Sequence, residues 1–301
     1  MSISSIKTLI TIVGPTAIGK TALSIALAKY FNTEIISCDS RQFYTEMSIG
    51  TAVPNAKELK EVAHHFIQDR SIFEEYSVGQ FERDALLKLD LLFKKNDTVI
   101  MVGGSGLYVD AVLDGLDYFP VVAPEIRTEL NQQLEKKGIN YLQEQLKSLD
   151  KETYQSIAIE NPHRLIRALE ICIGTGRPYS SFKNKPKAPR NFKSIKIGIN
   201  ADRLLIYQRI NERVDFMIKN GLLEEAKSLF SNRHLNALQT VGYKELFSFF
   251  DGNISKEFAI EEIKKNTRRF AKRQLTWFRK DPKINWFDYQ SPLSEILKKL
   301  K

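Results

Sequence analysis

The sequence predicts an α/β protein whose core is a P-loop NTPase-like parallel sheet interrupted by a helical insertion. Three observations lead to this prediction. A phosphate-loop motif follows an apolar run near the N-terminus, strand and helix patterns alternate over about the first hundred residues, and the patterns between about 114 and 190 are helical only. We therefore expect a core of residues 1–113 and 191–301 that ends in basic helices, with a helical domain of residues 114–190 between its two parts.

The first element is a short buried strand, "LITIV" at 9–13, which leads into "GPTAIGKT" at 14–21. The second string fits G-x-x-x-x-G-K-[ST], in which glycines let backbone amides turn around an anion. Lys20 adds a point charge, and Thr21 offers a hydroxyl to Mg²⁺. Apolar residues at helical spacing over 21–30 place a helix N-terminus behind the loop, where negative charge is favoured. A glycine-rich turn without a ligand is the alternative.

The next strand, "EIISCDS" at 34–40, ends at Asp39. Ligands of open α/β sheets bind at the carboxyl ends of strands, so Asp39 is expected near the phosphate loop. On position alone it could hold Mg²⁺, cap the following helix or accept a proton. After a helix around 81–95, "TVIMV" runs into "GGSG" at 103–106 and not into an acid. Without a Walker-B acid, the bound phosphate is expected to be a leaving group.

The insertion contains a second candidate site for an anion. Asn161 is placed to cap the helix of "NPHRLIRALE". His163, Arg164 and Arg167 crowd the opening turns of that helix, where cations oppose the helix dipole. An anion docked there would justify them, although Arg167 could simply pair with Glu170. The insertion closes with a basic loop at 183–193, and "IKIGINA" at 195–201 returns the chain to the sheet.

Composition points to a cytoplasmic protein with a polyanionic partner. The chain has 301 residues, a net charge of +9 and two cysteines, Cys38 and Cys172, without metal-ligand spacing. No apolar run is long enough to span a bilayer, so no membrane association is expected. His64 and His65 are adjacent, and strand geometry would point their rings to opposite faces, which predicts structural or surface roles.

A basic run near the C-terminus could bind nucleic acid. Every charged residue in "KKNTRRFAKRQLTWFRK" at 264–280 is basic, while Ile263, Phe270 and Trp277 recur at heptad spacing. This spacing predicts that the three apolar side chains fix one helix face to a core. A solvated charged face and a contact surface for RNA or DNA both remain open.

The motifs together resemble the bacterial tRNA dimethylallyltransferases, or isopentenyl pyrophosphate transferases, which prenylate adenosine 37 beside the anticodon. The resemblance covers nearly the whole chain. It rests on "GPTAIGKT", "SCDSRQFYTEMSIGTAVP", "HHFIQDRSIFEEYSVGQFERDA", "VGGSGLYVDA", "NPHRLIRALE", "RINERVDFMIKNGLLEEAK" and "TVGYKE" in the family's order and spacing.

The resemblance implies a role for each matching residue. Asp39 would be the general base that deprotonates the adenine amino group, and Ser105, where the family usually has threonine, would orient it. Thr21 would hold Mg²⁺ on the diphosphate of dimethylallyl diphosphate. The residues implied to bind this diphosphate are Gly14, Pro15, Thr16, Ala17, Ile18, Gly19, Lys20, Thr21 and Arg213. Those implied to bind the tRNA anticodon stem-loop are Asp39, Ser40, Arg41, Gln42, Ser105, Arg127, His163, Arg164, Leu165, Ile166 and Arg167.

Three residues depart from the family pattern, and two other functions remain open. Ile18 replaces a small serine in the loop, Val53 stands where lysine is frequent in "GTAKP", and Gln68 replaces an aspartate. A small-metabolite kinase could use the same loop for ATP, with Asp39 activating a hydroxyl. A non-catalytic RNA-binding module would tolerate loss of Asp39. We expect the chain to act as a monomer.

Overall fold

The computed structural model describes residues 6–300, which form two compact units. The first unit contains the residues up to Asp114 and those from Arg190 onward, and the second runs from Gly115 to Pro189. The expected boundaries, 1–113, 114–190 and 191–301, each lie one residue from these. We refer to the two parts as the core unit and the insertion unit.

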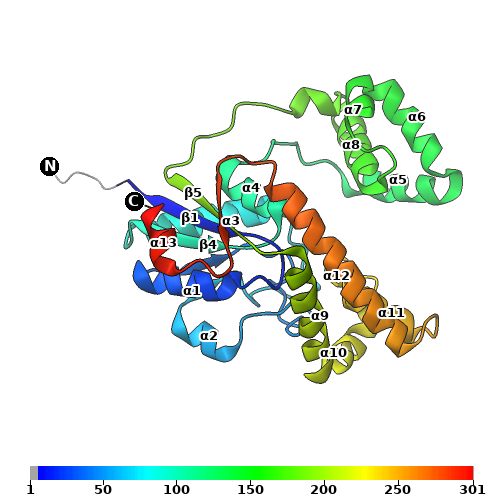
Figure 1. Cartoon of the computed structure of the whole chain (residues 1–301). Coiled ribbons are helices and arrows are strands. Elements are labelled where there is room, and N and C mark those ends of the chain that lie inside the picture. The colour runs from blue at the N-terminus through cyan, green and yellow to red at the C-terminus, as the bar shows by residue number, and fades with distance from the viewer. Residues whose placement is uncertain (1–5, 301) are drawn as a thin grey trace. The chain divides into compact units, whose positions relative to one another are not determined.

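The core unit is built on one parallel sheet, as predicted (Figure 1). Its strand order is β3-β2-β4-β1-β5-β6, so the strand before the phosphate loop lies near the middle. β1 pairs in parallel with both β4 and β5. The strands are β1 (Thr8–Val13), β2 (Ile35–Ser37), β3 (His64–His65), β4 (Thr98–Val102), β5 (Lys193–Asn200) and β6 (Ile284–Asp288). The strands β3 and β6 add to the four that the sequence predicts.

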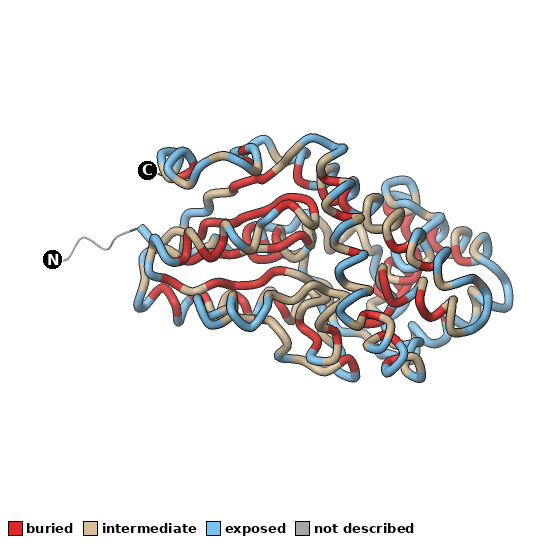
Figure 2. Tube along the Cα trace, turned by 60° about the horizontal axis from the view of Figure 1, so that its bottom comes forward, coloured by how far each residue is buried: buried red, intermediate tan, exposed pale blue. Residues whose placement is uncertain are grey.

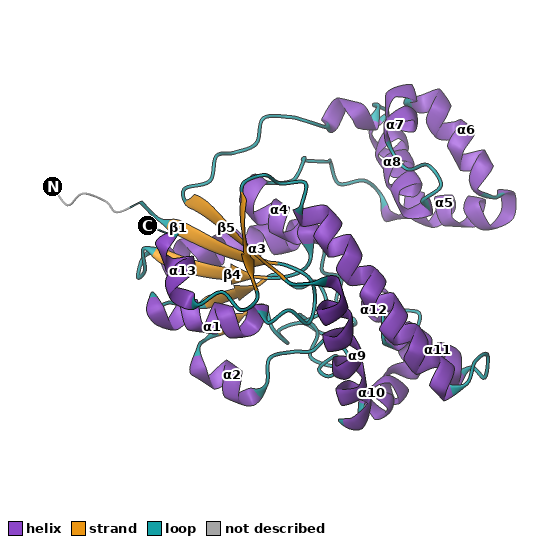
Figure 3. Cartoon of the chain, in the orientation of Figure 1, coloured by secondary structure: helices purple, strands orange, loops and turns teal. Residues whose placement is uncertain are grey.

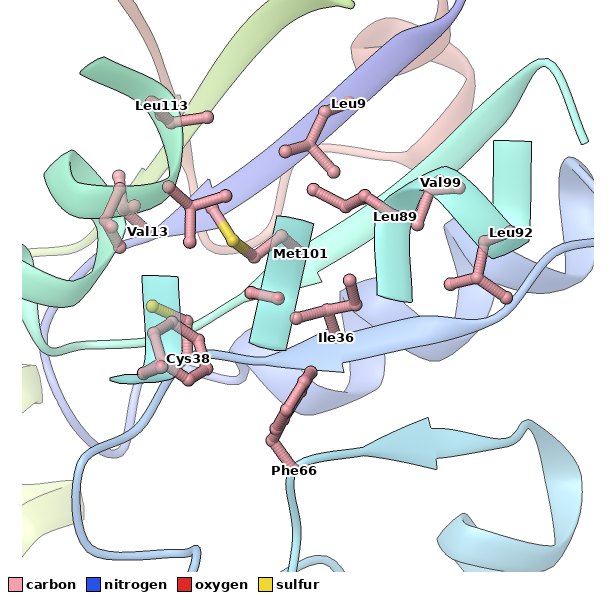
Figure 4. Close-up of a cluster of buried hydrophobic side chains, with 14 of the residues drawn as sticks. Leu9, Val13, Ile36, Cys38, Phe66, Leu89, Leu92, Val99, Met101 and Leu113 are labelled. Carbon is pink, nitrogen blue, oxygen red and sulfur yellow. The ribbon is translucent and has the colours of Figure 1, made fainter. Parts of the chain in front are cut away.

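Both faces of the sheet are covered by helices, which explains its unbroken apolar strands (Figure 3). In β1, Leu9 and Val13 join one buried cluster and Ile10 and Ile12 the other. Figure 4 shows the first cluster, where Leu89 lies near Met101 of β4. The first cluster includes residues of α3 (Val78–Phe93) and α4 (Gly106–Asp114), and the second includes residues of α1 (Lys20–Tyr30), α9 (Arg203–Lys219) and α13 (Leu293–Lys298).

A helical subdomain extends the core unit and has its own apolar cluster. Besides α9 it includes α10 (Leu222–Leu229), α11 (Tyr243–Phe250) and α12 (Lys256–Phe278), with short 3₁₀ turns at Phe230–Asn232 and Asn236–Leu238. The cluster is completed by Tyr44 and Met47, from the segment after β2, and by Ile72, which follows β3. The short helix α2 (Ala56–Glu61) lies in that same segment, between β2 and β3.

The buried face of α12 differs from the predicted heptad stripe. Ile263 is buried as expected, but Phe270 and Trp277 remain 37% and 39% exposed. In a straight α-helix, each residue is rotated by about 20° around the helix axis from the residue seven positions earlier. Phe270 and Trp277 therefore turn progressively away from the face on which Ile263 is buried. The stripe that stays inward consists of Ala259, Ile263, Ala271, Gln274 and Phe278.

The insertion unit is helical and has its own buried core, made mostly of leucines. Figure 2 colours the buried segments of the chain red. Its elements are α5 (Pro124–Lys137), α6 (Ile139–Leu149), α7 (Lys151–Ser156), α8 (Pro162–Thr175) and a 3₁₀ turn at Tyr179–Phe182. The Asn161 side chain caps α8, as predicted, by accepting hydrogen bonds from the backbone amides of His163 and Arg164. Within residues 6–300, no helix is both long and apolar enough to cross a membrane.

Candidate active site

The phosphate loop joins β1 to α1 and depends on unusual backbone conformations. Gly14 has φ of 147°, and a Cβ there would collide with the carbonyl oxygen of Ile199 on β5. Gly19, at the N-cap of α1, has φ of 102°. Ala17 adopts φ of 64°, a left-handed conformation that non-glycine residues rarely take and that often marks functional loops.

Three cationic side chains donate hydrogen bonds to this loop. The Lys20 ammonium lies 2.8 Å from the Pro15 carbonyl oxygen. From α9, Arg213 donates to the Thr16 hydroxyl at 3.1 Å, and Arg209 donates to the Ile18 carbonyl at 3.4 Å. Such a concentration of positive charge at a helix N-terminus favours an anionic ligand.

Burial lowers the pKa of Lys20 to about 8, an effect that nearby Asp39 opposes and Arg213 reinforces. Burial likewise lowers the pKa of Arg213, against the attraction of Asp39. Both shifts arise because burial deprives the two cations of solvation by water. A bound polyanion would raise the pKa of Lys20 again, because an opposite charge favours the protonated form.

Asp39 follows the end of β2 and contributes a carboxylate to this site. Its Oδ1 accepts a hydrogen bond from the Arg41 amide at 3.1 Å, which closes a tight turn. Among residues 6–300 this is the one hydrogen bond to its carboxylate, and no helix is capped by it. The capping alternative is therefore wrong, and proton or ligand chemistry remains.

Ser105 lies beside Asp39 but bonds to its neighbour. The Ser105 hydroxyl accepts from the Ser40 amide at 3.1 Å and donates to the Ser40 hydroxyl at 3.2 Å. In the described part of the chain, these bonds take the place of the expected contact with Asp39. The backbone here is close-packed, because a Cβ on Gly103 would collide with the Cys38 carbonyl oxygen.

A cavity of about 520 Å³ brings these groups together. Of the residues implied by the resemblance, it is lined by Thr16, Ala17, Ile18, Gly19, Lys20, Thr21, Asp39, Gln42 and Arg213. The other implied residues of the core unit, Gly14, Pro15, Ser40, Arg41 and Ser105, are not among its lining residues. The sequence reasoning missed other lining residues, namely Ser37, Thr51, Ala52, Pro54, His64, Ile67, Val102, Gly103, Gly104, Arg209, Glu212 and Phe216. Arg209 could have been found, because it precedes Arg213 by one helical turn.

Two residues implied to bind tRNA, Gln42 and Arg41, make hydrogen bonds within the protein. The Gln42 amide donates to the carbonyl oxygens of Thr51 and Ala52 at 3.1 and 3.0 Å. The Arg41 guanidinium donates to the carbonyl oxygens of Asn236 and Ala237 at 2.8 and 3.0 Å. Gln42 thereby shapes one wall of the cavity, and Arg41 ties the turn after β2 to the helical subdomain.

The same wall is anchored from α10. The Glu225 carboxylate accepts hydrogen bonds from the amides of Ser48, Ile49 and Gly50 at 3.0, 2.8 and 2.9 Å. It also accepts one from the Tyr243 hydroxyl at 2.6 Å, and burial together with this carboxylate raises the pKa of Tyr243. Four hydrogen bonds to the Glu225 carboxylate therefore fix the backbone of the segment that leads into Thr51 and Ala52.

The insertion unit contains the remaining implied residues. Glu170 is buried and accepts hydrogen bonds from Arg127 at 3.2 and 2.7 Å and from Arg167 at 3.0 Å. Burial disfavours its charge, but the two guanidinium groups outweigh this effect and lower the pKa of Glu170. The alternative pairing of Arg167 with Glu170 is therefore confirmed. His163 and Arg164 are exposed at the start of α8.

Leu165 and Ile166 require a correction. Their side chains are 0% and 4% exposed and belong to the core of the insertion unit. The apolar stripe of α8 turns them inward while the neighbouring cations face outward. They therefore cannot contact RNA through their side chains.

The comparisons with known proteins agree with this geometry. Residues 42–281 match the family model described as IPP transferase. The chain is 61% identical to the tRNA dimethylallyltransferase of Flavobacterium johnsoniae (97% of this chain, 96% of the relative) and 65% identical to that of Christiangramia forsetii (96% and 95%).

Solved structures give the same result. A tRNA isopentenylpyrophosphate transferase of Bacillus halodurans is 38% identical, with a TM-score of 0.71 over 98% of this chain and 94% of that one. A eukaryotic dimethylallyltransferase described as acting on tRNA is 26% identical, with a TM-score of 0.80 over 96% and 75%. Because these relatives are enzymes, the alternative of a non-catalytic RNA-binding module is excluded. The chain therefore belongs to the IPP transferase family and is a prenyl-transferring enzyme.

Proposed function

We propose that this enzyme transfers the dimethylallyl group of dimethylallyl diphosphate to N6 of adenosine 37 in tRNA, releasing diphosphate. The observation that carries the proposal is a single cavity in which a phosphate loop, clustered cations and the Asp39 carboxylate meet. The names of the relatives support tRNA as the acceptor and dimethylallyl as the transferred group.

The cationic side of the cavity suits the leaving group. As the bond between C1 and the bridging oxygen breaks, negative charge grows on diphosphate and positive charge spreads over the allyl group. Lys20 and Arg213, with Arg209 beside them, would stabilise the departing anion. The loop from Gly14 to Thr21 would hold the same diphosphate through its backbone amides.

The carboxylate side suits the acceptor. The exocyclic amine attacks as a neutral nucleophile, and its nitrogen becomes cationic as the new carbon–nitrogen bond forms. Asp39 would accept the proton, while Ser105 fixes the turn at Ser40 and so aims the carboxylate. The adenine must leave its stack to enter the cavity, at a cost of a few kcal/mol that is smallest in an open loop.

The residues of the cavity fit a magnesium ion that arrives with the donor. No cluster of three or more histidine, cysteine or acidic side chains suited to a metal occurs in the described chain. Mg²⁺ commonly keeps several waters and binds one or two protein oxygens plus phosphate oxygens, so the Thr21 hydroxyl beside the diphosphate is a sufficient protein ligand. Bound there, the ion would neutralise charge on the diphosphate.

The exposed cations suit the anticodon stem-loop. His163 and Arg164 at the start of α8 would contact phosphates, and Arg127 and Arg167 would add charge from the same unit. On α12, Arg269, Lys272 and Arg273 are exposed. Arg268 is not, because it bonds to Asn211 at 2.7 Å and lies over the Tyr207 ring.

The deciding experiment is incubation of the enzyme with labelled dimethylallyl diphosphate, Mg²⁺ and unmodified tRNA, followed by nucleoside mass analysis. The expected product is N6-dimethylallyladenosine at position 37. Label at another nucleotide or ring atom would contradict the proposed acceptor. Phosphate transfer from ATP to a small molecule, without prenylation, would instead support the kinase alternative.

A further inference from the structure

A buried glutamine of α12 connects the two loops that form the cavity. The Gln274 side chain is 5% exposed. Its Oε1 accepts a hydrogen bond from the Thr16 amide in the phosphate loop at 2.9 Å. Its Nε2 donates to the Gly104 carbonyl oxygen in the "GGSG" loop, also at 2.9 Å.

The packing around this bridge leaves little freedom. A Cβ on Gly104 would collide with Gln274 Nε2 and would lie 3.9 Å from the Lys20 ammonium. One turn further along the helix, Trp277 packs against Gly106 and donates its indole N–H to Asp110 at 2.9 Å. Helix α12 thus contacts the chain on both sides of residue 105, at Gly104 and at Gly106.

We propose that Gln274 is a positioning residue, which sets the phosphate loop at Thr16 and the "GGSG" loop at Gly104 in register with each other. It does not line the cavity and acts through the groups that do. Its bond to Thr16 would position the hydroxyl that accepts a hydrogen bond from Arg213. Its bond to Gly104 would position Ser105, whose hydroxyl accepts a hydrogen bond from the Ser40 amide. The proposal takes the identity of the donor and acceptor from the proposed function.

Both atoms of the amide are needed for this task. Gln274→Met keeps the length and removes both hydrogen bonds, leaving a buried amide and a buried carbonyl unpaired. Gln274→Glu keeps the acceptor for Thr16 but, when ionised, presents an oxygen to the Gly104 carbonyl. A protonated carboxyl would again donate to that carbonyl.

The test measures binding of inorganic diphosphate with Mg²⁺ in the absence of RNA, between pH 5.5 and 8, for each variant relative to wild type. We expect Gln274→Met to bind between about tenfold and a hundredfold more weakly, because small displacements of an organised site are expensive. Gln274→Glu should bind weakly at pH 8 and approach wild type as pH falls. Single-turnover prenyl transfer should follow the same order.

Gln155→Met, which changes an exposed glutamine of the insertion unit, is the control and should leave binding unchanged. Wild-type affinity in Gln274→Met would overturn the proposal. So would equal losses in both variants at every pH, which would indicate a general loss of structure. If Gln274→Met does not fold, the titration of Gln274→Glu decides alone. Diphosphate binding is scored separately from prenyl transfer, so failure of the proposed reaction would be seen independently.

Discussion

Asp39 and Lys20 are opposite charges in one cavity, and Asp39 influences the protonation of Lys20. Asp39 favours the charged form of Lys20, while burial favours the neutral form and prevails. The two side chains line the same cavity but have different proposed roles: Asp39 as the base and Lys20 as a ligand of the diphosphate. The two residues therefore make separable predictions.

Asp39→Asn should slow single-turnover prenyl transfer by roughly a hundredfold or more, the range expected for a lost general base. The affinity for an anticodon stem-loop should stay nearly constant, because the amide is isosteric with the carboxylate. Asp90→Asn, at an exposed position of α3, is the matched control. Turnover of Asp39→Asn within a few-fold of wild type would remove Asp39 from the role of base.

Donor binding should weaken as pH rises through about 8. Burial lowers the pKa of Lys20 to about 8, so Lys20 loses its positive charge as pH rises through that value, whereas the diphosphate ester is already fully ionised. The measurement is the dissociation constant of dimethylallyl diphosphate from pH 6.5 to 9.5 without RNA. Lys20→Arg should lack the inflection, since arginine stays protonated. The same inflection in Lys20→Arg would assign it to another group.

At the scale of elements, the sequence predicts what local patterns encode. The strands β1 and β4 can be predicted from the sequence because they are unbroken apolar runs next to glycine-rich loops. The two-residue strand β3 and the edge strand β6, whose "INWFD" alternates irregularly between buried and exposed, carry no such signal. The phosphate loop and the position of Asp39 follow from local motifs, but the bond between Thr16 and Gln274 joins residues 258 apart in the sequence.

The outer face of α12 should contribute electrostatically to RNA binding. Arg269→Gln with Arg273→Gln removes two exposed cations that are four residues apart on one helix face. Each lost phosphate contact should weaken binding similarly across RNA sequences and flatten the log–log salt dependence by somewhat under one unit. Filter binding of an anticodon stem-loop at several salt concentrations measures this.

The control for that experiment is Lys94→Gln with Lys95→Gln, which removes the same charge from an exposed pair just after α3. It separates a local contact from a change in net charge. An equal loss of affinity in both double variants would attribute the effect to net charge. An unchanged slope in the α12 variant would return this helix face to a solvated, structural role.

At the scale of the whole molecule, the two compact units divide the proposed work. All residues that line the cavity lie in the core unit, whereas Arg127, His163, Arg164 and Arg167 lie in the insertion unit. Each unit has its own apolar core, so a surface change in one should not disturb packing in the other. Donor binding and RNA binding should therefore respond to different substitutions.

Arg164→Gln should weaken binding of the anticodon stem-loop while the dissociation constant of dimethylallyl diphosphate, measured without RNA, stays unchanged. Arg164 is exposed in the first turn of α8, where a cation opposes the helix dipole and gains from a bound phosphate. The expected loss is a few-fold at low salt and smaller at high salt, because counterion release supplies it. Lys136→Gln, at an exposed position of α5, removes the same charge from the same unit and should have less effect. Should Arg164→Gln weaken donor binding as much as RNA binding, the division of work between the units would be wrong, and the insertion unit would have to act on the cavity itself.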